Sequence, residues 1–209
     1  MSVRVYVEGG GDYKHTDTNT ACRQGFATLL KRVGLPQRSF SVVACGGRNE
    51  THEDFRMAVH QNKAQFLILL VDSEAPVAAG AGTWAHLKAH DNWDRPRGVT
   101  DDQAHLMVQC MEAWFLADRE ALERFYGQGF RKRALPGRPD IEQAPKPSLI
   151  PALERATRAT SKGKYDKVRH GFALLAEIDA EQVTARSEHA RRLFDTVIRE
   201  TRQSAGDRR

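Results

Sequence analysis

The sequence contains few cysteines and no long hydrophobic segment. Its 3 cysteines are far apart and form no short paired motif. This pattern is typical of reduced thiols and argues against a disulfide framework or a cysteine-based zinc site. No apolar run is long enough to cross a membrane, and residues 1–4 lead directly into a predicted strand without a signal-peptide pattern. We therefore expect a cytoplasmic protein that has no membrane partner.

The chain also lacks a phosphate-binding loop of the Gly-x-x-x-x-Gly-Lys-Ser/Thr type, and it has no internal repeat or low-complexity segment. Without that loop, ATP hydrolysis by the P-loop route is excluded, so any energy coupling requires a separate ATPase. A chain of 209 residues is long enough to bury one core and a small appended region.

Positive charge is concentrated in the second half of a chain whose net charge is +5. A basic surface suits a polyanion such as nucleic acid, although solvated helix faces are the simpler explanation of charge alone. The candidate nucleic-acid contacts are Arg131, Lys132, Arg133, Lys162 and Arg169.

The chain is organised around residues 65–71, a short and continuous apolar run. Such a run is typical of a strand that is buried on both faces at the centre of a parallel sheet. The surrounding strands and helices alternate along the chain, which predicts an α/β fold of Rossmann-like type with a mainly parallel sheet flanked by helices. The predicted strands are 2–7, 39–45, 65–71 and 104–109, and the predicted helices between the first three are 19–33 and 51–62.

We divide the chain into an α/β core over 1–126 and a basic linker with a helical C-terminal region over 127–209, packed on the core. Pro and Gly mark the linker at 127–147. Helical patterns then follow, the last two joined by residues 179–185. The predicted helices are 110–118 and 119–126 in the core, then 148–160, 167–177 and 187–202.

Segment 75–103 is rich in Pro and Gly and is predicted to be irregular. Trp84 and Trp93 could stack on bases, but we expect them to anchor this segment to the body of the protein. His86 and His90 have a spacing that suits metal binding on a helix, yet no third ligand accompanies them. We place both histidines on the surface.

Acidic residues directly follow two of the strands. Glu8 follows strand 2–7 in a glycine-rich turn that also contains Asp12, and Asp72 and Glu74 follow strand 65–71. The carboxyl ends of parallel strands meet at one edge of a sheet, so these carboxylates converge if the strands are neighbours. Clustered carboxylates repel one another without a cation, and oxygen ligands suit Mg²⁺ or Mn²⁺. Turns and helix caps also favour Asp and Glu for structural reasons alone.

Glu112 interrupts an apolar run just after strand 104–109. Its carboxylate either completes the acidic cluster or complements the amino terminus of the helix predicted over 110–118.

The placement of Glu8 after the first strand and of Asp72-x-Glu74 after a later strand resembles the Toprim arrangement. Toprim domains carry an acidic residue and an acidic pair, usually Asp-x-Asp, at these places, and Glu74 replaces the second Asp here. Glutamate also coordinates magnesium. The variant Glu8-Gly9-x-x-Asp12 is similar to that of the overcoming-lysogenization-defect (OLD) nucleases.

A closer resemblance is to the bacterial DUF4276 family of Toprim-like proteins, and it spans nearly the whole chain. Its most specific part is Met111-Glu112-Ala113-Trp114. The resemblance implies a Toprim core, a metal-dependent nuclease and association with AAA- or ABC-type ATPases in anti-phage defence loci. The segments that resemble the family are 7–12, 70–74, 109–118, Lys164-Tyr165-x-Lys167 and Arg186-Ser187.

Our first hypothesis is a nuclease that cleaves nucleic-acid phosphodiesters and acts as the effector of a defence system. Glu8 is a ligand or general base, and Asp72 and Glu74 are ligands. Lys164 and Lys167 stabilise charge if their helix folds back over the sheet edge, and otherwise they lie on a solvated helix face. The candidate metal ligands are Glu8, Asp12, Asp72, Glu74 and Glu112.

The main alternative is a non-catalytic Toprim-like subunit whose basic half binds nucleic acid or an ATPase. A third hypothesis is another phosphoryl-transfer reaction on a nucleotide. The sequence leaves open whether the substrate is DNA or RNA, and whether the chain forms a homo-oligomer.

Overall fold

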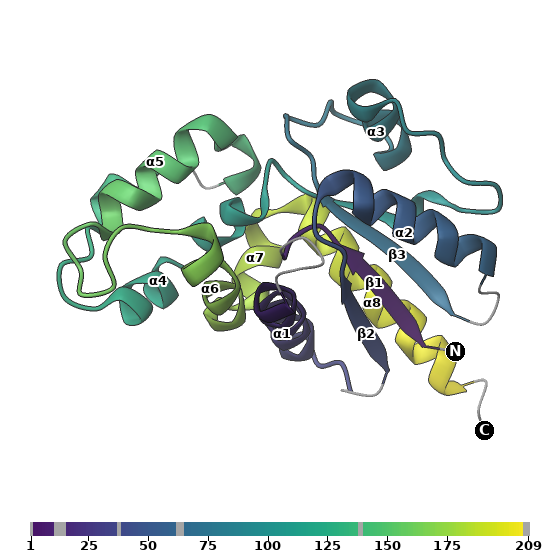
Figure 1. The fold of residues 1–209 in the computed structure, drawn as a ribbon, viewed down its shortest axis with the longest axis horizontal. Helices are drawn as coiled ribbons and strands as arrows, with labels where there is room; N and C mark the ends of the chain where they lie inside the picture. The colour runs from purple at the N-terminus through teal and green to yellow at the C-terminus, as the bar shows by residue number, and fades with distance from the viewer. Residues whose placement is uncertain (1, 11–15, 37–38, 62–64, 138–139, 207–209) are drawn as a thin grey trace.

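The computed structural model describes residues 2–10, 16–36, 39–61, 65–137 and 140–206. Four parallel strands form a sheet in the order β2-β1-β3-β4 (Figure 1). The predicted α/β fold, with a mainly parallel sheet flanked by helices, is therefore confirmed. The strands are β1 (Val3–Val7), β2 (Phe40–Ala44), β3 (Phe66–Asp72) and β4 (Ala104–Met107).

Side chains of β3 alternate between two hydrophobic layers, one on each face of the sheet. Leu67, Leu69 and Val71 belong to one layer, and Ile68 and Leu70 belong to the other. Because both faces are covered, every position from 67 to 71 is apolar, and the strand lacks the alternation typical of half-exposed strands.

Helices cover both faces of the sheet (Figure 1). On one face lie α2 (Arg48–Gln61) and α3 (Thr83–Asp91). On the other lie α1 (Thr16–Arg32) and α8 (Glu188–Gly206), with α6 (Phe172–Glu177) packed on α1. None of the helices within the described ranges is long and apolar enough to span a lipid bilayer.

The hydrophobic layer on the α1 face of the sheet continues beyond the carboxyl ends of the strands into a region built of helices. The hydrophobic layer that begins at Val3 and Val5 continues without a break to Leu149 and Leu153. Figure 1 shows these helices gathered beyond the carboxyl ends of the strands. The helices not yet named are α4 (Arg119–Tyr126), α5 (Lys146–Thr157) and α7 (Ala180–Arg186).

Segment 75–103, predicted to be irregular, contains α3 in its middle. Gly82 precedes this helix and Asn92 ends it in the left-handed conformation, so the breakers flank the helix without interrupting it. Trp84 and Trp93 are 5 % and 9 % exposed and pack in the α2 layer. Their predicted role as anchors is confirmed, while the expectation of a wholly irregular segment is wrong.

Three other local predictions require correction. The described parts of segment 127–147, 127–137 and 140–147, contain short 3-10 turns with Leu135 and Ile141 buried beside them. The connection expected over 179–185 is the helix α7, and the helix expected over 110–118 is a 3-10 turn at Met111–Leu116.

The helix predicted over 167–177 begins as a π-helical turn, Lys167–Gly171, before α6. Within this turn, a Cβ atom at Gly171 would meet the Tyr165 hydroxyl at 3.2 Å, so glycine suits the close approach.

Candidate metal centre

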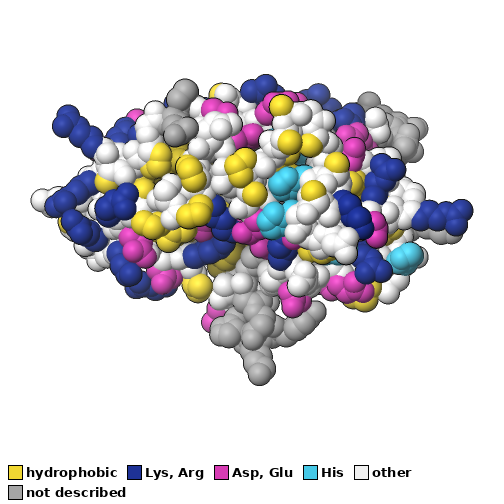
Figure 2. Space-filling view, turned by 90° about the horizontal axis from the view of Figure 1, so that it is seen from above, with side chains coloured by type: hydrophobic (Ala, Val, Ile, Leu, Met, Phe, Trp, Pro, Cys, Tyr) yellow, Lys and Arg dark blue, Asp and Glu magenta, His cyan; other side chains and the backbone are white. Residues whose placement is uncertain are grey.

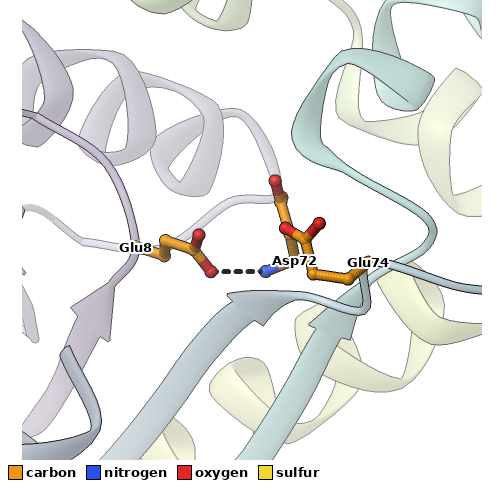
Figure 3. Close-up of side chains that lie close together, drawn as sticks. All are labelled: Glu8, Asp72 and Glu74. Carbon is orange, nitrogen blue, oxygen red and sulfur yellow. Dashed lines mark hydrogen bonds between the residues drawn. The ribbon is translucent and has the colours of Figure 1, made fainter. Parts of the chain in front are cut away.

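Glu8, Asp72 and Glu74 lie together where β1 and β3 end (Figure 3). One carboxylate oxygen from each residue lies within 4.8 Å of the other two. β1 and β3 pair in parallel with Val7 opposite Leu70, so the residues that follow leave the sheet side by side. The structure thus brings these three predicted residues together, whereas Asp12 lies outside the described residues.

Glu8 is oriented by two donors that share one of its oxygens. The backbone N–H of Asp72 and the guanidinium of Arg48 each donate to Oε2 over 3.1 Å. The following Gly9 and Gly10 have φ angles of 137° and 96°, which side chains other than glycine rarely adopt. Glycine at both positions therefore permits the backbone conformation that directly follows Glu8.

Asp72 is the most buried member of the centre, with 2 % of its surface exposed. Its Oδ1 accepts a hydrogen bond from the backbone N–H of Met111 over 2.8 Å. Its Oδ2 lies 3.5 Å from Nζ of Lys146 and 4.0 Å from Nζ of Lys167. Burial raises the pKa of Asp72 to about 7, an effect that Lys167 opposes.

Glu74 has a φ angle of 63°, in the left-handed region that is unusual for a residue other than glycine. That conformation costs about 1 kcal/mol. The backbone N–H of Glu74 donates to the carbonyl of Gln109 over 3.0 Å, which helps to fix the turn. The turn directs the carboxylate of Glu74 back toward that of Asp72 (Figure 3).

Two lysines neutralise the carboxylates. Lys146, at the start of α5, forms an ion pair with Glu74, and this pairing raises its pKa although burial opposes the shift. Lys167, whose side chain is 50 % exposed, lies 3.5 Å from Oε1 of Glu112. Burial likewise opposes a shift at Lys167, but Glu112 and Asp72 raise its pKa. Both ammonium groups are therefore protonated near neutral pH.

Sequence reasoning identified Lys167 but missed Lys146. Lys146 is 72 residues from Glu74 in the chain, and no local spacing relates the two.

Glu112 lies against Tyr165 and Lys167, outside the group of three carboxylates. Its Oε1 accepts a hydrogen bond from the Tyr165 hydroxyl over 3.1 Å. With 1 % of its surface exposed, Glu112 is a buried carboxylate held by a phenol and an ammonium group. Its contacts suit a residue that positions Lys167 better than a ligand shared with Glu8.

The remaining predicted lysine, Lys164, is not brought to the centre. Its Nζ lies 3.3 Å from Glu154 on the exposed side of α5.

The predicted nucleic-acid contacts are on the surface but are partly paired. Lys132 forms an ion pair with Glu120, Lys162 lies 4.8 Å from the Phe125 ring centroid, and Arg169 is 3.7 Å from Asp166. Arg131 and Arg133 are exposed. Figure 2 shows positive side chains interspersed with acidic ones over the upper face. The structure thus provides scattered positive charge on this face instead of one uniform basic patch.

The α2 side of the centre is closed by Arg48 and α3. Asp91 accepts hydrogen bonds from Nε and Nη2 of Arg48, each over 2.7 Å. His86 Nε2 donates to the carbonyl of Ser73 over 2.8 Å, which places this half-buried histidine beside the acidic turn. Sequence reasoning did not assign either Arg48 or His86 to the centre.

The donor set fits a divalent cation. The three carboxylates supply only oxygen ligands, the type that Mg²⁺ and Mn²⁺ prefer. Residues that would hold the ion are Glu8, Asp72 and Glu74, with Lys146 and Lys167 at its edge.

A family model described as a domain of unknown function, DUF4276, matches residues 7–198. The chain belongs to the DUF4276 family. No curated protein and no solved structure matches it. Because the description of the DUF4276 family states no activity, the function of this DUF4276 protein has to be argued from the chemistry of the centre. The Toprim and OLD relationship stays a prediction.

Proposed function

We propose that this DUF4276 protein is a Mg²⁺- or Mn²⁺-dependent nuclease that hydrolyses nucleic-acid phosphodiester bonds. The observation that carries the proposal is the meeting of Glu8, Asp72 and Glu74 within 4.8 Å at the carboxyl edge of the sheet. Two ammonium groups lie against these carboxylates, from Lys146 and Lys167. This combination of anionic ligands and cationic donors suits a reaction in which a phosphate gains negative charge.

Hydrolysis requires an activated water molecule and relief of charge on the phosphate. A divalent ion bound by the three carboxylates would supply both, by lowering the pKa of water and polarising the phosphate. Glu8 is a ligand or the general base, because both of its donors occupy Oε2 and leave Oε1 for the ion or for a proton from the water. Asp72 is fixed through Oδ1 by Met111, so its Oδ2 is the ligand atom.

The two lysines stabilise the transition state. Lys146 pairs with Glu74 and lies near Asp72, and when these carboxylates are neutralised its ammonium group becomes available to a phosphate oxygen. Lys167 is held at the centre by buried Glu112, which itself is fixed by Tyr165. Charge-assisted hydrogen bonds from such groups favour the phosphate when its charge rises.

The test is cleavage of single- and double-stranded DNA and RNA with Mg²⁺, with Mn²⁺ and with EDTA. We expect cleavage that requires a divalent metal and falls by about a hundredfold or more in Asp72→Asn. The matched control is Glu154→Gln. Glu154 is a carboxylate away from the centre that pairs with Lys164, and we expect this variant to retain full activity. Circular dichroism and thermal unfolding establish that both variants are folded. Cleavage that persists in EDTA or in Asp72→Asn contradicts the proposal.

One observation favours a non-catalytic alternative. Lys146 and Lys167 already balance much of the carboxylate charge, so the cluster could serve as a structural ion-pair network. A non-catalytic subunit, whose acidic cluster binds a structural ion or a partner, predicts binding without metal-dependent cleavage. The effector role in anti-phage defence and the separate ATPase partner rest on the family resemblance alone, and they are tested by adding candidate ATPases to an inactive preparation.

A further inference from the structure

A pocket of about 580 Å³ lies between α2 and the segment that follows α3. One wall is formed by α2 residues at positions 49, 52, 53, 56 and 60, which share a helix face because of their spacing. The opposite wall is formed by residues 92–96. Its size is within the range of about 300–1,000 Å³ that is usual for small-ligand pockets.

Arg48 contacts both the candidate metal centre and a residue that lines this pocket. The guanidinium of Arg48 lies 3.1 Å from Oε2 of Glu8. The same group lies 5.0 Å from the ring centroid of Trp93, which lines the pocket. Asp91 holds Arg48 through two hydrogen bonds, so the connection between centre and pocket is fixed.

The pocket wall contains flat rings and a buried polar atom without a partner. His52 stacks on Trp93 with ring centroids 4.0 Å apart and planes 8° from parallel. His52 is 8 % exposed, and its Nε2 has no hydrogen-bond partner among the described residues. Leaving a buried polar atom unpaired is costly, and a ligand would pair with Nε2 only if the His52 side chain turned toward the pocket.

The acidic residues of the pocket are already paired. Glu53 forms an ion pair with Arg56 at 2.9 Å, and Asp94 forms one with Lys88 at 2.9 Å. Arg95 is exposed and has no ion pair with any described residue. The positive charge that remains for a ligand is thus on Arg95, beside the stacked rings.

We propose that this pocket binds one nucleotide of a single nucleic-acid strand, next to the phosphate that lies at the metal centre. The inference rests on the proposed nuclease function and specifies its substrate as unpaired nucleic acid. A base enters a concave pocket only when it is unstacked and unpaired, which a duplex resists. Arg95 contacts the adjoining phosphate, and the wall of His52 and Trp93 faces the base.

The test measures binding of a fluorescent single-stranded oligonucleotide, as DNA and as RNA, by anisotropy in EDTA and in Ca²⁺. We expect Arg95→Ala to weaken binding about tenfold, which is the scale of one nucleotide contact. The matched control is Arg97→Ala, because Arg97 is also exposed and lies two residues away but does not line the pocket. We expect its affinity to equal that of the wild type.

The outcomes separate this inference from the nuclease proposal. Binding that depends on Arg95 but is not followed by cleavage, either alone or with candidate ATPases added, supports the pocket and rejects the nuclease. Cleavage and binding that are the same in both arginine variants reject the pocket and leave the nuclease standing. Absence of binding in both buffers, tighter binding of a duplex, or equal binding of a free mononucleotide also overturns the single-strand assignment.

Discussion

Asp72 has its two carboxylate oxygens in different surroundings. Oδ1 is held by the backbone of Met111, and Oδ2 faces two ammonium groups. Removal of the Asp72 side chain from water raises its pKa, so the lysines are needed to keep it ionised. At the residue scale, therefore, a cation must be present for the carboxylates to meet, and Lys146 and a divalent ion compete for that role.

This competition predicts that Lys146→Met strengthens metal binding. The substitution removes the ammonium group from Glu74 and leaves the three carboxylates more negative. We expect the affinity for Mn²⁺ to rise about fivefold, since a partly exposed charge pair contributes about 1 kcal/mol. Isothermal titration calorimetry measures this without any need for catalysis. Lys164→Met, which removes a lysine paired with Glu154, is the control, and unchanged or weaker binding in Lys146→Met would show that the two cations do not compete.

The three converging carboxylates could be predicted because each directly follows a strand. A strand fixes the direction of the next one or two residues, and neighbouring parallel strands bring their ends to one edge. Lys146 could not be predicted this way, because its position depends on contacts with distant segments. Lys164 was assigned to the centre on the condition that its helix folds back over the sheet edge. Lys164 precedes the π-helical turn Lys167–Gly171 and pairs with Glu154, whereas Lys167 lies beside Asp72.

At the scale of elements, the start of α5 is held in place by hydrogen bonds that extend to α8. The side-chain amide of Gln109 makes two hydrogen bonds. Its Oε1 accepts one from the backbone N–H of Lys146 over 3.2 Å, and its Nε2 donates one to the carbonyl of Glu142 over 3.4 Å. The carboxylate of Glu142 accepts from Ser187 Oγ over 2.6 Å and from the backbone N–H of His189 over 3.0 Å. These bonds link the amino terminus of α8 to the lysine of the centre.

Ser187→Ala is expected to destabilise the protein by about 1–2 kcal/mol. Ser187 is 2 % exposed, caps α8 by accepting from the N–H of Ala190 over 3.0 Å, and donates to Glu142. Urea unfolding followed by circular dichroism measures the loss. Ser148→Ala is a matched control, since exposed Ser148 donates only to a local carbonyl, and its expected effect is below about 0.5 kcal/mol. Equal stabilities of the two variants would show that the link to α8 contributes little.

The helix α3 shows why some elements were not predicted from sequence. It is 9 residues long and lies between stretches rich in Gly and Pro, which usually indicate loops. Its stability comes from tertiary packing, because Trp84 and Leu87 are buried in the α2 layer. The strands and the longer helices were predictable because their hydrophobic patterns are local and regular.

At the scale of the whole molecule, burial keeps two histidines, His52 and His105, in the neutral form. His105, in β4, is fully buried and donates through Nε2 to the carbonyl of Asp102 over 3.0 Å. Burial lowers its pKa to about 3, and burial also lowers the pKa of His52 to about 4. Both imidazoles are therefore neutral in the folded protein at pH 5, whereas the unfolded chain binds protons there.

The contribution of His105 to stability is expected to fall as pH decreases from about 6.5 toward 3, whereas Asp72, whose pKa is raised to about 7, acts in the opposite direction. The unfolded state binds the proton first because the folded-state pKa of His105 is lowered, so each pH unit in this window costs up to about 1.4 kcal/mol. Urea unfolding at pH 7 and pH 5 measures the difference, and His105→Gln reduces it by about 2 kcal/mol. A variant that keeps the full wild-type difference would show that His105 does not contribute to the acid sensitivity.

Glu8 and Asp72 follow strand positions that face opposite sides of the sheet, and this affects how substitutions on the two sides combine. Glu8 continues the series of β1 that faces α2 and contacts Arg48, whereas Asp72 continues the series of β3 that faces α1 and contacts Met111. The sheet keeps the two layers apart everywhere else along these strands. Substitutions in the separate layers thus become interdependent at the centre, where we expect their effects on stability to be non-additive.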